Sequence, residues 1–489
     1  MEDDQLKTRT ARSIKWNAID RVASQVLYGV TGFVLASLLS SEEFGLVGVV
    51  MIFQAFATLF VDSGFSYALI QKKHPTQEDY SSVLWFNLGV STLLYVILFF
   101  CAPLIADFFG DERLIGLSRV MFLSFVLNGS AIVQTNMLMK RMEVKMIAVS
   151  NSLGLVVAGA VGIGLALAGY GAWALVWQTV TLGAVKSLVL WTTQHWVPQL
   201  SFSWSTIRSF FAISSRMMAS SFLNVLFQYV YNFFIGKRGI SLLGYYSQSD
   251  KWSKMGVSSI TQVLASSFLP TLSAVQDDDE RYRRACSKIN RFTSYLVYPF
   301  IGGLIVLAAP IFHTLWGSKW DPSIVLFQLL LVRGVFTVWV NLFNNYLLSR
   351  GHAKAIMRLE ILRDGVAIAV LLATLSYIGV PKGDNIVWGI EIMLWGQIAA
   401  AFVTFVVSLV YTMRLVDMSC GGFMRDNAPY LGLTALIIPI MIAAGSAMPS
   451  PPLKLAVEAV VGLGLYLGAN HVAGSVIQRE VLGFIRKKK

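Results

Sequence analysis

Cationic and amide side chains recur at helical spacing inside apolar stretches of this 489-residue chain. Arg21 and Gln25 share one face of a stretch that begins near residue 13. Arg216 and Asn224 do the same in a stretch that begins near residue 207. Guanidinium groups bind the oxygens of an anion bidentately, and most strongly away from water. These two faces are therefore candidate binding surfaces for an anionic group.

Acidic residues stand on two further polar faces. Asp62 ends a weak polar stripe. Asp250, Lys251 and Lys254 belong to the most polar stripe found in any of the apolar stretches. The two lysines extend the set of candidate anion-binding residues. Asp62 and Asp250 are candidate sites for a coupling proton or sodium ion, with structural ion pairing as the alternative.

A second charged group is predicted further along, where Arg333 is followed by Glu360, Arg363 and Asp364. The spacing of Glu360 and Asp364 around Arg363 favours an internal ion pair over substrate contact. Arg333 and Arg363 nevertheless remain candidate substrate residues.

The composition shows what these stretches are. Hydrophobic residues make up 55% of the chain and charged residues 13%, and the mean hydropathy is +0.63. A water-soluble protein of that composition is implausible. The basic residues behind the net charge of +12 lie between the apolar stretches, so anionic lipid headgroups are the expected partners and nucleic acid is not.

The chain is predicted to be an all-α polytopic membrane protein, because its apolar stretches are about twenty residues long. About fourteen transmembrane helices are expected, at residues 13–39, 44–70, 83–107, 114–139, 146–168, 171–193, 207–235, 241–271, 291–315, 322–349, 355–379, 386–413, 427–447 and 453–475.

Basic residues alternate between successive connectors, in a ratio of about four to one. The poorer set holds only Arg113, Lys237, Arg238, Lys319, Lys382 and Lys454. Since basic connectors are retained in the cytoplasm, both termini are predicted to be cytoplasmic.

Two halves of the chain resemble each other. Residues 136–145 and 345–354 share the pattern Asn-x-Leu-x-x-Arg-x-x-x-Lys at the ends of the fourth and tenth predicted helices. Gly45 and Gly244 stand at the starts of the second and eighth. Two six-helix lobes are expected, at residues 1–200 and 201–420, followed by two helices and a basic tail at 421–489.

Three stretches carry a resemblance to a known family: residues 38–47, 59–73 and 102–110. They resemble the polysaccharide-flippase branch of the multidrug/oligosaccharidyl-lipid/polysaccharide exporter superfamily, in particular its Wzx-type proteins. Weaker likeness continues through residues 171–176, 268–273 and 317–320. The chain departs from the family pattern at Tyr231 and Gln248, where an acid and an arginine are expected.

The resemblance implies a bacterial inner-membrane protein whose two pseudo-symmetric lobes surround a central cavity. It implies alternating-access transport of a polyprenyl-diphosphate-linked oligosaccharide for surface polysaccharide, with a polymerase and export machinery as further partners. No cofactor is expected beyond a coupling H+ or Na+, since the sequence has no Gly-rich nucleotide loop.

Two alternatives remain open. One is an ion-coupled multidrug exporter of the same superfamily, although organic cations favour acidic or aromatic cavities over basic ones. The other is a polytopic polymerase or glycosyltransferase, an enzyme that needs a large outer loop or an acidic metal site. The outer connectors are only a few residues long, so a protein that is not an enzyme is expected.

Overall fold

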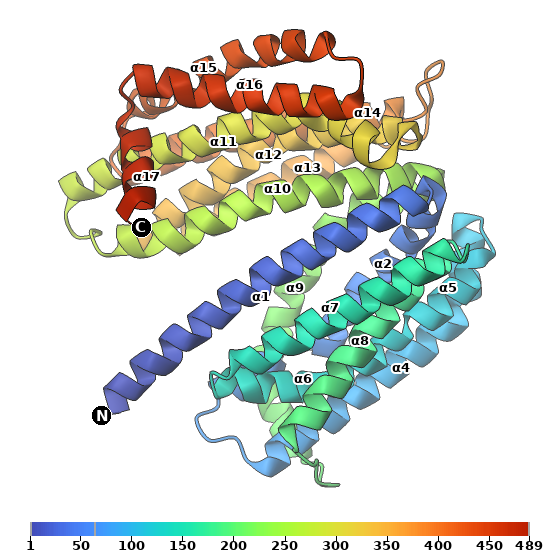
Figure 1. The fold of residues 1–489 in the computed structure, drawn as a ribbon. Helices are drawn as coiled ribbons and strands as arrows, with labels where there is room; N and C mark the ends of the chain where they lie inside the picture. Colours follow the sequence, from blue (N-terminus) through green and yellow to red (C-terminus); the bar gives the residue numbers. More distant parts are fainter. Residues whose placement is uncertain (1, 63–64, 488–489) are drawn as a thin grey trace. The chain divides into compact units, whose positions relative to one another are not determined.

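The computed structural model is built of helices and describes the backbone of residues 2–62 and 65–487 (Figure 1). Some side chains within these ranges lie outside the description, and those of Asp62 and Arg216 are among them. The chain divides into two compact units, Met1–Gly244 and Tyr245–Lys489. They are called unit 1 and unit 2 below.

In unit 1, α7 and α8 lie side by side, and α1 packs along α7 (Figure 1). The adjoining helix α6 packs on both α8 and α4, while α9 packs on α2. The helices of unit 1 are α1 (Glu2–Leu38), α2 (Ser41–Asp62), α3 (Phe65–Gln71), α4 (Gln77–Phe109), α5 (Arg113–Met121), α6 (Leu123–Lys140), α7 (Val144–Leu167), α8 (Ala172–Gln194) and α9 (Trp204–Arg238).

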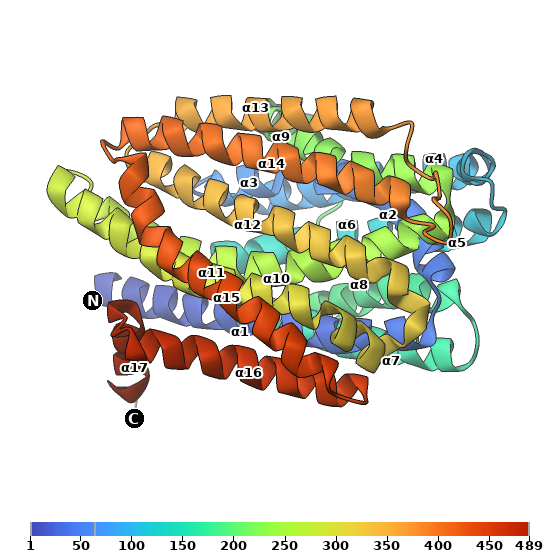
Figure 2. The same ribbon diagram turned by 90° about the horizontal axis from the view of Figure 1, so that it is seen from above.

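In unit 2, α14 packs between α12 and α13, and α11 packs on α12, α15 and α16 (Figure 2). The helix α10 (Ile240–Ser273) begins in unit 1 and continues into unit 2. The others are α11 (Asp279–Trp316), the short 3-10 helix η1 (Ser318–Trp320), α12 (Asp321–Ser349), α13 (Ala353–Thr374), α14 (Trp388–Leu415), α15 (Cys420–Ser446), α16 (Pro451–Val472) and α17 (Val476–Lys487).

Every predicted transmembrane stretch is helical over most of its length, so the all-α prediction is confirmed. The fourth stretch is broken at Phe122, where α5 and α6 meet. The described residues of the second stretch form α2 and α3. Within the described residues, eleven helices are long and apolar enough to cross a membrane. The more polar α9, α10 and α13 are not among them, so the count of fourteen crossings stays a prediction.

The repeat at the ends of α6 and α12 extends to the backbone. The amide N–H groups of Met142 and Glu143 donate to the carbonyls of Met139 and Leu138, at 3.0 and 2.9 Å. At the equivalent place in unit 2, Gly351 and His352 donate to Leu348 and Leu347, at 3.0 and 2.8 Å. Met142 and Gly351 both have positive φ, at 59° and 76°. The two helices therefore end in the same left-handed turn.

The other repeat pair, Gly45 and Gly244, makes a reciprocal contact inside unit 1. A methyl group on Gly45 would overlap the carbonyl oxygen of Ile240, and one on Gly244 would overlap the carbonyl oxygen of Ser41. The first turns of α2 and α10 therefore touch backbone to backbone. Only glycine permits so close an approach.

Candidate functional site

A cavity of about 410 Å³ lies within unit 1, between α2, α3, α6 and α8. This volume is within the range of about 300–1,000 Å³ that is usual for ligand sites. Its polar lining consists of hydroxyl groups, amide groups and one ammonium group: Thr58, Ser66, Asn128, Thr135, Asn136 and Lys186. Asn136 donates to the Ser66 hydroxyl at 2.9 Å, which ties α6 to α3 across the cavity wall. Such a lining offers both donors and acceptors to a polar ligand.

Lys186 is the only charged residue of α8, and among the described side chains it is the only charged one that lines this cavity. Within the described part of the chain it makes no hydrogen bond or ion pair. Asp20 on α1 acts on it electrostatically, but the Asp20 carboxylate accepts its hydrogen bonds from Ser24 at 3.4 Å and Asn151 at 3.1 Å. A lysine at the centre of a membrane helix costs about 2.5–3.5 kcal/mol on insertion scales. An ammonium left without a direct partner suits an anionic ligand.

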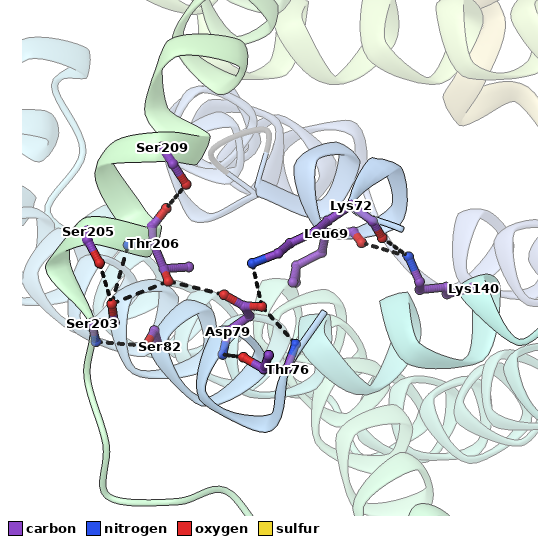
Figure 3. A network of polar contacts seen from close by, with 10 residues as sticks. All are labelled: Leu69, Lys72, Thr76, Asp79, Ser82, Lys140, Ser203, Ser205, Thr206 and Ser209. Carbon is purple, nitrogen blue, oxygen red and sulfur yellow. Dashed lines mark hydrogen bonds and ion pairs between the residues drawn. The ribbon is translucent and has the colours of Figure 1, made fainter. Parts of the chain in front are cut away.

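A buried carboxylate next to this cavity holds α3, α4 and α9 together (Figure 3). Asp79 accepts from Lys72 Nζ and from the Thr76 backbone N–H, both at 2.7 Å, and from the Thr206 hydroxyl at 3.1 Å. Thr76 returns the contact by capping α4. Lys140 of α6 donates to the carbonyls of Leu69 and Ile70 at the end of α3 and to that of Lys72, which follows it. These contacts fix α3, which supplies part of the cavity wall.

Unit 2 brings three of the predicted site residues together. The Asp250 carboxylate pairs with Lys254 on the same helix at 2.6 Å and with Arg333 on α12 at 3.4 Å. Arg333 also donates to the amide oxygen of Gln397 on α14. Asp250 is 9% exposed. Ion pairing accounts for these charges by itself, so roles in substrate binding or coupling stay predictions.

The sequence placed Arg333 with the charges at residues 360–364, and this grouping is wrong. The described contacts of Arg333 are with α10 and α14. Arg363 instead pairs with its neighbour Asp364 at 3.0 Å and is half exposed. The ion pair favoured for Arg363 is therefore present, without Arg333.

The remaining predicted residues do not form a cluster that the structure describes. Arg21 and Gln25 on α1 and Asn224 on α9 are exposed. Lys251 Nζ lies 5.2 Å from the centre of the Trp252 ring. Arg216 and Asp62 are helical residues whose side chains lie outside the description, and all these assignments stay predictions.

Sequence reasoning missed Lys186, although a signal was present. It is the single charge in an otherwise uncharged stretch of twenty-three residues, and an ionisable group in such a stretch is a functional candidate by default. Gln397 and the Asp20–Asn151 contact carried no comparable signal, since each depends on which helices meet.

Replacing Asp250 by asparagine should lower the thermal stability of the purified protein, because Lys254 and Arg333 lose their shared counter-charge. Breaking a buried pair costs about 3–5 kcal/mol, and the exposure of Lys254 puts the expected loss at the lower end. Adding Arg333→Gln should recover about 0.5–3 kcal/mol of that loss. Thermal unfolding in detergent measures both values.

The matched control is Arg363→Gln, which should change stability by less than about 0.5 kcal/mol. If the single and double variants are equally unstable, the pair does not stabilise unit 2. If the double variant regains stability but transports nothing, the Asp250–Arg333 pair is needed for transport as well as for packing.

Residues 34–325 of the chain match the family described as polysaccharide biosynthesis protein. The succinoglycan biosynthesis transport protein ExoT of Rhizobium meliloti (strain 1021) is 26% identical over 498 residues, covering 98% of this chain and 96% of ExoT. The lipopolysaccharide biosynthesis protein WzxC of Escherichia coli (strain K12) is 23% identical over 377 residues, covering 75% of each chain.

Among solved structures, the lipid II flippase MurJ in an inward closed conformation is similar with a TM-score of 0.72. The two chains are 13% identical, and the match covers 96% of this chain and 100% of MurJ. At that identity the likeness shows the fold alone. The many apolar helices, the fold and the family match together establish a multi-pass membrane protein that belongs to the polysaccharide biosynthesis protein family.

Proposed function

We propose that this protein is a flippase that moves a polyprenyl-diphosphate-linked oligosaccharide from the cytoplasmic to the outer leaflet of a bacterial inner membrane. The observation that carries the proposal is the unit 1 cavity, where hydroxyl and amide groups surround the ammonium of Lys186. Hydroxyls and amides match sugar hydroxyls, and an ammonium matches a diphosphate or an acidic sugar. The names of ExoT and WzxC support the same assignment.

The depth of Lys186 agrees with entry from the cytoplasm. It lies eight residues before the end of α8, or about 12 Å at 1.5 Å per residue. The basic connectors predict that end to be cytoplasmic. An anionic headgroup entering from that side would meet Lys186 before the middle of the bilayer.

Alternating access requires each unit to tolerate two arrangements, and a coupling ion would bias them. Of the two candidate sites for a coupling proton or sodium ion, Asp250 is the one whose side chain the structure describes. It is buried and lies beside two cations. Asp62 is the second. The polymerase and export proteins that use the flipped product are the proposed partners.

The alternative function is that of a multidrug exporter, and the positive charge in the unit 1 cavity disfavours it. An organic cation would have to enter beside an ammonium that has no direct counter-charge among the described side chains, and like charges repel. An enzyme is disfavoured because ExoT is named a transport protein and MurJ, whose fold is similar, is named a flippase.

Depleting the protein in its own host should make diphosphate-linked repeat units accumulate in the cytoplasmic leaflet. The measurement labels outer-leaflet glycan on intact spheroplasts and compares it with the total lipid-linked glycan. Restoring the wild-type gene should restore outer-leaflet labelling. Normal labelling after depletion, in a strain without a second flippase, would overturn the proposal, as would a selective rise in sensitivity to cationic drugs.

A further inference from the structure

A second cavity, of about 380 Å³, lies within unit 2 where α11, α15 and α17 meet. Its polar lining is Arg284, Ser287, Lys288 and Arg291 from α11, Tyr430 from α15 and Glu480 from α17. The three cations follow three- and four-residue spacing, so they line one face of α11. No part of the proposed transport path uses them.

One of these cations, Arg291, is held in a fixed orientation by a buried carboxylate. Arg291 Nε donates to Asp426 Oδ1 at 2.6 Å, and Ser287 donates to Asp426 Oδ2 at 2.5 Å. Asp426 is 4% exposed, whereas the Arg291 side chain is 45% exposed. Within the described residues, the terminal Nη groups of Arg291 have no acceptor. A guanidinium fixed through Nε leaves a planar pair of donors, the geometry that binds two phosphate oxygens.

The helix α17 closes the cavity and is itself anchored to unit 2. Ile477 is 3% exposed and packs with Tyr295, Met441 and Tyr466. Glu480 pairs with Lys288 at 2.8 Å. The sequence from residue 476 to the end carries five basic residues and one acidic residue. An amphipathic, basic helix of this kind lies at the surface of an anionic membrane.

The length of α11 places the cavity at the level of the lipid headgroups. Its 38 residues span about 57 Å at 1.5 Å per residue, against a hydrocarbon core of about 30 Å. The charged residues 281–291 occupy its first turns, so these turns extend beyond the hydrocarbon. The basic connectors predict this end to be cytoplasmic, and the anionic lipids of that leaflet bind basic pockets between helices.

We propose that the cavity between α11, α15 and α17 binds the phosphate of an anionic phospholipid such as phosphatidylglycerol. Arg284 also pairs with Glu280 at 3.5 Å, as Lys288 does with Glu480. The Nη groups of Arg291, and the N–H groups of Arg284 and Lys288 that these carboxylates leave available, hold the phosphate oxygens. Tyr430 adds a hydroxyl. The lipid thereby fixes α17 against α11 and α15, independently of what unit 1 transports.

The test compares two pairs of substitutions on the same helix. Arg284→Gln/Lys288→Gln removes two cations from the cavity lining, and Arg281→Gln/Arg283→Gln removes two cations from α11 outside it. Native mass spectrometry of the full-length protein, loaded with phosphatidylglycerol or phosphatidylcholine, measures the lipid that stays bound. The first pair should reduce phosphatidylglycerol retention about fivefold or more, and the second less than about twofold, because outer charges act only through screened attraction.

Arg291→Lys serves as a second variant, since it keeps a cation beside Asp426 but loses the planar fork. Retention should fall while the thermal unfolding temperature stays near wild type. If the two double variants lose the same amount of bound phosphatidylglycerol, the lipid is held by general attraction to basic residues and not by this cavity, which would overturn the proposal. Equal retention of both lipids would also overturn it. So would inorganic phosphate that displaces the lipid and stabilises lipid-free protein, because the ligand would then be the free anion.

Discussion

Lys186→Met should reduce transport per folded molecule by about tenfold or more, because a charge-assisted hydrogen bond contributes about 1.5–3 kcal/mol and 1.4 kcal/mol corresponds to a factor of ten. The amount of folded protein should stay the same or rise. Methionine has a similar length, and it removes an ammonium that has no direct partner among the described side chains and costs about 2.5–3.5 kcal/mol in the membrane. Flux in proteoliposomes, divided by the folded fraction, is the quantity to measure.

Two further variants sharpen that experiment. Lys186→Arg keeps the charge and should recover part of the flux, while Lys73→Met removes an exposed connector cation and should leave it unchanged. Normal flux per molecule in Lys186→Met would show that the ammonium does not touch the transported group. A proportional fall in folded protein and flux would show that Lys186 serves packing.

Gly244→Ala and Gly45→Ala should each sharply lower the yield of folded protein. The added methyl group would overlap a backbone carbonyl of the facing helix, which cannot move aside as a flexible side chain can. Overpacking of this kind costs about 1–3 kcal/mol and more where backbone must shift. The measurement is the monodisperse fraction after detergent extraction, with thermal unfolding of whatever survives.

The controls predict a change of opposite sign. Gly164 on α7 and Gly432 on α15 have no atom within 4 Å of an added methyl group. Alanine is favoured over glycine in a helix interior by about 1 kcal/mol, so Gly164→Ala and Gly432→Ala should be neutral or stabilising. If Gly45→Ala behaves like Gly164→Ala, the first turns of α2 and α10 are not in backbone contact.

The helices could be predicted from the sequence because a membrane demands about twenty apolar residues for each crossing. The break between α5 and α6 could not be predicted, since Phe122 and its neighbours are as apolar as the helix interiors. The basic tail was expected without structure, yet α17 forms there because Ile477 finds a place in the core of unit 2. Apolar length says little about where a helix bends or docks.

The candidate site residues could also be predicted from the sequence only in part. A polar face drew attention to Asp250 and Lys254, and Arg333 was assigned to a separate charged group, but the pairing of the three depends on which helices are neighbours. The cavity in unit 1 has contributions from four helices, none of which is strongly polar alone. Lys186 stands out in the sequence as a lone charge, but a search for polar stripes does not find it because it lies on none.

The contact between the starts of α2 and α10 also fixes the register of these two helices inside unit 1. Ser41 faces Gly244 and Ile240 faces Gly45, and the two positions of each repeat pair are 199 residues apart in the sequence. Each glycine lies against a backbone carbonyl of the facing helix. A slip of one residue in either helix would bring a larger side chain against that carbonyl, so the two glycines hold the first turn of α10 at one position along α2.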